Sequence, residues 1–84
     1  MDFAEDITRR ARWAIDYNDG HPNPAWSTGE KLAVALVLGD RAYLKAAGYT
    51  KTQALTRLAG DIGDTNAGAW LAHVRGALEA DDDD

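Results

Sequence analysis

Seven consecutive apolar residues, Leu32–Leu38, constrain the fold of this chain more than any other feature. They follow Ser27-Thr28-Gly29-Glu30, which has the pattern of a capping box that starts a helix. The capping box favours a helix here, although two valines in the run also suit a buried strand. Because such a helix is apolar on every face, we expect it to lie at the centre of the domain.

The pattern predicts four helices in all. The central one spans about 28–47, with a kink or a break at Gly39-Asp40 left open. The first spans about 2–18 and places apolar residues at helical spacing on one face: Phe3, Ile7, Ala11, Ala14 and Ile15. A short third helix begins at a second capping signature, Thr50 with Gln53, and ends before a turn over 60–64. The fourth spans about 66–80, capped by Asp64 or Thr65. We therefore predict an all-α fold, a compact bundle of about four helices.

Length and charge limit the organisation and the partners. A chain of 84 residues makes one domain, here residues 1–80, followed by an acidic tail at 81–84 that we expect to be disordered. The net charge is −5, and the four aspartates of the tail leave the body close to −1. A body so nearly neutral lacks the basic footprint of a nucleic-acid binder, so nucleic acid is not the expected partner.

No sequence feature indicates a membrane segment or export. The N-terminus is acidic and lacks the basic and then apolar pattern of a secretion signal. The seven-residue apolar run is far shorter than the roughly 20 residues that span a bilayer. The absence of cysteine excludes disulfides and thiolate metal sites. We expect a cytoplasmic protein without a membrane partner.

The chain shows no recognisable catalytic or ligand-binding motif. The two histidines, His21 and His73, have no metal-ligand spacing with each other or with a cysteine. Asp61 and Asp64 flank Ile62-Gly63 like part of a calcium loop, but the full ligand series is missing. We therefore predict no enzyme activity, no catalytic residue, no cofactor and no metal.

The loop between the first two helices is the strongest candidate for a partner contact. It contains two prolines and a glycine, and aromatic residues occur in it and beside it. Tyrosine and tryptophan are common anchors of binding interfaces. For the two tryptophans the competing interpretation is core packing. The predicted partner-binding residues are Trp13, Tyr17, His21, Pro24 and Trp26.

Two alternatives concern the last two helices. The stretch from Leu55 to Ala72 has the core spacing of a helix-turn-helix, which would make this a DNA-binding or transcription-regulating protein. Its second helix has no Lys or Arg before Arg75, and the competing interpretation is a plain helical hairpin. The apolar stripe of the last helix, with Trp70, could also close a homo-oligomer if the body leaves it uncovered.

The segment DGHPNPAWSTGEKLAVALVL at 19–38, together with Gly48-Tyr49-Thr50 and the helix over 54–58, resembles small orphan proteins of bacteriophages that infect mycobacteria and other actinobacteria. That family has no assigned activity, so the resemblance implies a source and a setting, the cytoplasm of the infected host, and carries over no functional residue. Small accessory phage proteins commonly bind a host or phage protein, which is an argument by association. We expect a non-enzymatic, phage-encoded accessory protein that binds such a protein.

Overall fold

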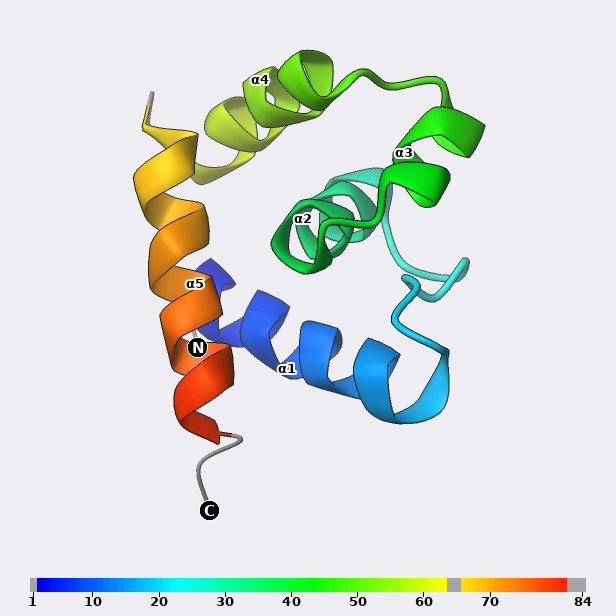
Figure 1. Ribbon diagram of the computed structural model, residues 1–84. Coiled ribbons are helices and arrows are strands. Elements are labelled where there is room, and N and C mark those ends of the chain that lie inside the picture. Colours follow the sequence, from blue (N-terminus) through cyan, green and yellow to red (C-terminus); the bar gives the residue numbers. More distant parts are fainter. Residues whose placement is uncertain (1, 64–65, 82–84) are drawn as a thin grey trace.

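The computed structural model describes residues 2–63 and 66–81, and these form five helices and no strand (Figure 1). The helices are α1 (Phe3–Tyr17), α2 (Thr28–Leu38), α3 (Arg41–Ala47), α4 (Lys51–Ile62) and α5 (Ala67–Asp81). The all-α prediction is confirmed. The prediction of about four helices is corrected to five, because the expected central helix over 28–47 is two helices.

The break between α2 and α3 is made by Gly39 and Asp40. Gly39 ends α2 with φ of 68°, in the left-handed region that a glycine enters without steric cost. Asp40 then caps α3, because its carboxylate accepts a hydrogen bond from the amide of Tyr43 at 3.0 Å. The chain thus stops one helix and starts the next within two residues, although the apolar pattern runs on to Tyr43 and Leu44.

α2 is the centre of the core. Each residue from Leu32 to Val37 is at most 5% exposed. The helix contacts α1, α3, α4 and α5, and Figure 1 shows it nearly end-on, with α4 above it, α1 below it and α5 at one side. The predicted capping box is present, since the Ser27 hydroxyl accepts from the amide of Glu30 and the Glu30 carboxylate accepts from the amide of Ser27.

Arg75 of α5 satisfies the carbonyl groups at the end of α2. Its Nη2 donates to the carbonyl of Leu36 at 2.7 Å, and its Nε donates to the carbonyl of Val37 at 3.0 Å. The last carbonyls of a helix have no partner within the helix, so a donor from elsewhere must supply one or leave them to water. A guanidinium also places a positive charge at the negative end of the helix.

The remaining boundaries differ from the prediction by a few residues. The capping box of α4 is present at Thr50 and Gln53, but the helix continues through the predicted turn to Ile62 before Gly63 ends it. At the start of α5 the side chain of Asn66 accepts from the amide of Ala69 at 3.0 Å and so acts as the cap. Asp64, Thr65 and the tail residues 82–84 lie outside the described residues, while Asp81 is the last residue of α5. Within the described ranges no helix combines the length and apolarity that a membrane crossing needs.

Replacing Gly39 with alanine should destabilise the fold through backbone conformation alone. A Cβ at Gly39 would meet no atom within 4 Å, so no steric clash is expected. The loss in the free energy of unfolding comes from holding alanine at a left-handed φ and is about 1–2 kcal/mol. Gly60 lies inside α4 and is equally open, so Gly60→Ala should stabilise by about 0.5–1 kcal/mol. Urea unfolding of both variants measures these changes, and a Gly39→Ala variant as stable as the parent would contradict the assigned break.

Removing the guanidinium of Arg75 should also destabilise the fold. We expect Arg75→Gln to lower the free energy of unfolding by about 1.5 kcal/mol. This is the lower end of the range for hydrogen bonds to a charged group, and we choose it because Arg75 is exposed. Arg57→Gln is the matched control, since Arg57 makes only a 3.5 Å surface pair with Asp61, worth at most about 0.5 kcal/mol. Equal losses from the two variants in urea unfolding would show that Arg75 does not support α2.

Candidate functional site

Three aromatic rings meet where α1 ends and α2 begins. Trp13 and Tyr17 are one helical turn apart on α1, and their ring centroids are 6.3 Å apart. Trp26, in the loop before α2, meets Trp13 edge to face at a centroid distance of 5.4 Å and an interplanar angle of 60°. We call these three residues the aromatic surface. Both tryptophans are half-buried and also pack against the core, whereas Tyr17 is 76% exposed.

Arg10 fixes the position of Trp26. Its guanidinium carbon lies 5.0 Å from the centroid of the Trp26 ring, at cation–π distance. Its Nε contacts Asp6 at 2.9 Å and its Nη2 contacts Glu30 at 2.8 Å. Glu30 is the acidic member of the α2 capping box. One arginine therefore joins α1, the start of α2 and the base of the aromatic surface.

The loop from Asn18 to Ser27 is irregular but extensively hydrogen-bonded. The Asn18 side chain donates to the carbonyls of His21 and Pro22, at 2.8 and 3.2 Å. The amide of Gly20 donates to the carbonyl of Ala14 at 2.8 Å, which fastens the loop to the end of α1. Pro22, within this loop, is buried. These contacts hold the loop in one conformation and so fix the position of Trp26 in the aromatic surface.

His21 joins the same loop to the junction of α2 and α3. Its Nδ1 lies 2.6 Å from Oδ2 of Asp40, whose side chain is 6% exposed while that of His21 is 55% exposed. The hydrogen bond to Asp40 raises the pKa of His21 above 6.5, helped by the charges of Asp40 and Asp19 and opposed by partial burial. Burial and the charge of Asp40 also raise the pKa of Tyr43 above 10.0.

The structure brings together three of the five predicted partner-binding residues, Trp13, Tyr17 and Trp26. His21 is engaged with Asp40, and Pro24 is exposed in a turn of the loop, with its carbonyl 3.5 Å from the Lys31 amine. Ile15, expected on the apolar face of the first helix, is not buried with the rest of that face, because its side chain is 43% exposed. Ile15 is two positions from Tyr17, roughly 200° around the helix, so it lies outside the aromatic surface.

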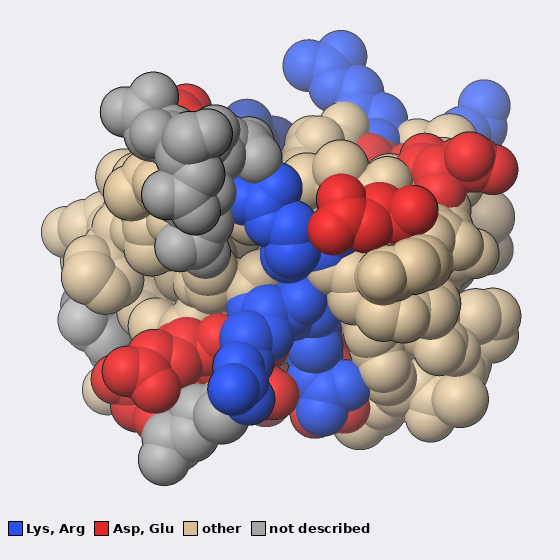
Figure 2. All heavy atoms as spheres, turned by 90° about the horizontal axis from the view of Figure 1, so that it is seen from below, with Lys and Arg blue, Asp and Glu red and all other residues tan. Residues whose placement is uncertain are grey.

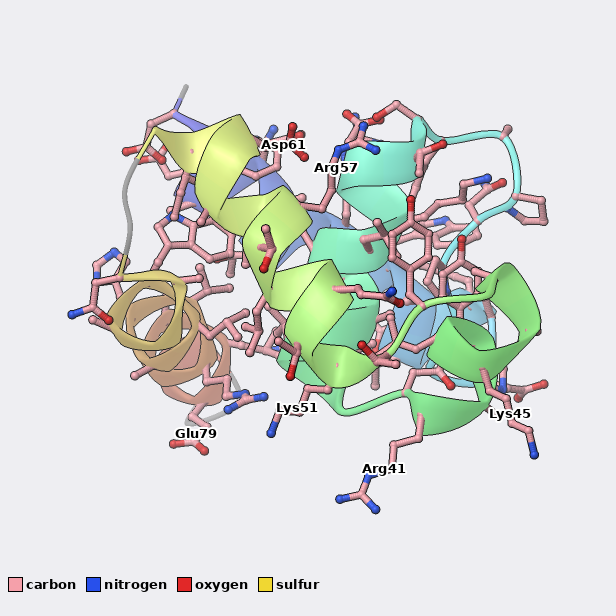
Figure 3. The ribbon with its side chains drawn as sticks, turned by 90° about the horizontal axis from the view of Figure 1, so that it is seen from above. Arg41, Lys45, Lys51, Arg57, Asp61 and Glu79 are labelled. Carbon is pink, nitrogen blue, oxygen red and sulfur yellow. The ribbon has the colours of Figure 1, made fainter. Side chains whose placement is uncertain are left out.

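A concave feature away from the aromatic surface combines residues from four helices. It is a groove of about 510 Å³ at the end of α2, lined by Ala35, Leu36, Gly39, Arg41, Leu44, Lys45, Tyr49, Lys51 and Arg75. We call it the basic groove, because its lining, as far as the structure describes it, includes four cations and no carboxylate. Figure 3 shows that Arg41, Lys45 and Lys51 project from one edge of the molecule, where Glu79 also lies, outside the lining, while Arg57 and Asp61 lie at the opposite edge. Sequence analysis missed this groove.

A second group of Lys and Arg side chains lies on another face of the molecule (Figure 2). Figure 2 shows the molecule from below, where Lys and Arg side chains form a run across the middle of the face, with Asp and Glu on both sides. Within α1, Arg10 and Asp6 form an ion pair one helical turn apart. Such flanking carboxylates neutralise the cations locally, unlike the lining of the basic groove.

The described residues offer no group of three or more His, Cys, Asp or Glu side chains that could hold a metal ion. Asp61, considered for a calcium loop, instead pairs with Arg57 and lies against the first turn of α2. A Cβ on Gly29 would stand 2.6 Å from its Oδ2. A carboxylate in that position interacts favourably with the positive, N-terminal end of the α2 dipole, so Asp61 has a structural role.

α5 presents few groups that could read DNA. Asn66 caps the helix, and Arg75 donates to the α2 carbonyls. The other exposed positions of the helix, leaving out its terminal residue, are mainly small: Gly68, Ala69, Ala72, His73, Gly76, Ala77, Glu79 and Ala80. The apolar stripe that could have closed a homo-oligomer is covered by the body of the same chain, and Trp70 stacks on Phe3 at 5.5 Å.

Comparison with known proteins gives no relative from which a function could be transferred: no protein-family model, curated protein or solved structure matches this chain.

The His21–Asp40 pair predicts a pH dependence of stability. Because the folded-state pKa of His21 is raised above the unfolded value of 6.5, its stabilisation is complete below that value and is lost as the pH rises through the folded pKa. The parent should therefore be more stable to urea at pH 6 than at pH 8. The difference in stability between the two pH values should shrink in His21→Gln. It should persist in the control His73→Gln, which leaves the His21–Asp40 pair intact. An unchanged difference in His21→Gln would show that the pair does not cause the pH dependence.

Proposed function

We propose that this chain is a non-enzymatic accessory protein, encoded by a bacteriophage, that binds a host or phage protein in the host cytoplasm through the aromatic surface. The observation that carries the proposal is the exposure of Tyr17 at 76%, next to the half-buried pair of Trp13 and Trp26. Tyrosine offers a large amphipathic contact area and is enriched among the residues that dominate binding energies.

The rigidity of the base supports the proposal. Trp26 is held by Trp13 and by Arg10, and Arg10 is itself held by two carboxylates. Tyr17 is the last residue of α1, just before a hydrogen-bonded loop. A surface ordered before binding avoids the entropy cost of ordering it in the complex.

The extent of the surface follows from ordinary interface dimensions. A standard interface covers about 800 Å² on each partner. One tyrosine cannot supply that area, so the contact must extend along the loop to exposed neighbours of Trp26, such as Pro24 and Ala25. In this arrangement Tyr17 supplies the central contact and the loop supplies the rim.

The resemblance of residues 19–38 to small phage proteins supports the proposed source and setting. The side chains of the aromatic surface offer amphipathic contact area, which suits a binding role, and His21 of the adjoining loop pairs with Asp40. We propose no cofactor and no metal.

The test is an affinity pull-down from actinobacterial lysate with the tagged parent and two variants. Tyr17→Ala removes an exposed ring, and Ile15→Ala, which removes the other large exposed apolar side chain of the described residues, is the matched control. We expect one defined protein to be retained by the parent and by Ile15→Ala. Its affinity for Tyr17→Ala, measured with the purified partner, should fall about 30-fold, as expected for a hot spot.

Equal retention by Tyr17→Ala and the parent would contradict the role of the aromatic surface. Retention of duplex DNA in place of a protein, weakening steeply with added salt, would favour the helix-turn-helix alternative.

A further inference from the structure

The basic groove is chemically distinct from the aromatic surface. Its lining includes three large, mainly apolar residues, Leu36, Leu44 and Tyr49, which are buried or half-buried and which we call the floor. Three exposed cations stand around it: Arg41 and Lys45 of α3 and Lys51 in the first turn of α4. Among the residues that the structure describes, no carboxylate lines the groove. A groove with an apolar floor and a cationic rim matches a ligand that carries both an apolar side chain and negative charge.

The fourth cation of the lining has a structural task. Arg75 donates from two of its nitrogens to the α2 carbonyls, at 2.7 and 3.0 Å. Arg41, Lys45 and Lys51 therefore supply most of the charge that a ligand would meet. They are surface side chains, so each ion pair with a ligand adds little to the binding free energy on its own. These contributions also decrease as salt is added.

We propose that the basic groove binds an acidic peptide segment of a partner protein, with one apolar side chain on the Leu36–Leu44–Tyr49 floor and carboxylates facing Arg41, Lys45 and Lys51. A peptide is favoured over nucleic acid for two reasons. Phosphates alone would leave the apolar floor unused, and the net charge of −5 opposes a long polyanion while tolerating a short segment. The proposal does not depend on the aromatic surface.

The probe is a short fluorescein-labelled peptide that combines aspartates with two leucines, and the readout is fluorescence anisotropy with the full chain. We expect saturable binding at low salt that weakens as salt is added. Two control peptides separate the contributions, one with asparagine in place of aspartate and one with serine in place of leucine. Both should bind about tenfold more weakly than the probe.

Variants assign the binding to the groove. The double substitution Arg41→Gln with Lys45→Gln changes two exposed side chains and should weaken probe binding about tenfold. Arg57→Gln removes a cation at the opposite edge of the molecule and should change it less than about twofold. Tyr17→Ala should leave probe binding unchanged, so failure of this proposal and failure of the proposed function are distinguishable.

Several outcomes would overturn the proposal. They are no binding of the probe by the parent at low salt, equal binding of the asparagine peptide, and an equal loss in Arg57→Gln. Tighter binding of a short DNA duplex, lost in the double variant, would make the groove a nucleic-acid contact instead. Displacement of the probe by a peptide of the chain's own residues 76–84, at equal affinity, would assign the groove to a second copy of the chain.

Discussion

The burial of α2 on all sides is the constraint on which the rest of the fold depends. Successive residues of a helix point about 100° apart, so six consecutive buried residues, Leu32–Val37, face every direction around the axis. The helix therefore needs cover all round, which α1, α3, α4 and α5 supply (Figure 1). Its ends must also find partners for unpaired backbone groups, and they find them in Ser27 and Glu30 at one end and in Arg75 at the other.

Both candidate surfaces are built at the ends of this buried helix. The aromatic surface adjoins its start, where Glu30 holds Arg10 and Arg10 lies over Trp26. The basic groove lies at its end, where Arg75 also satisfies the last carbonyls. The His21–Asp40 pair connects the loop of the first surface with the junction beside the second. The same contacts that stabilise α2 thus position the side chains available to a partner.

Local sequence signals predicted most of the helices, because capping boxes and apolar spacing act over a few residues. The two boxes at Ser27 and Thr50 are present, and three of the five predicted partner-binding residues gather into one surface. The break at Gly39 could only be left open, since the apolar pattern continues beyond it. Gly39 and Asp40 make the break, and Arg75, far along the chain, satisfies the α2 carbonyls next to it. Ile15 is exposed because it lies at the flank of the α1 stripe, near the end of that helix.

The basic groove had no clear sequence signal, because its cations come from three helices and only Arg41 and Lys45 lie one helical turn apart. The net charge of −5 also conceals it, since a sum over the chain says nothing about where each sign lies. In a chain whose charge is segregated, the overall repulsion disfavours non-specific contact with nucleic acid, while a local cluster such as Arg41, Lys45 and Lys51 still attracts a short acidic segment. The acidic composition and a positively charged binding groove are therefore compatible, and the first makes the second more selective.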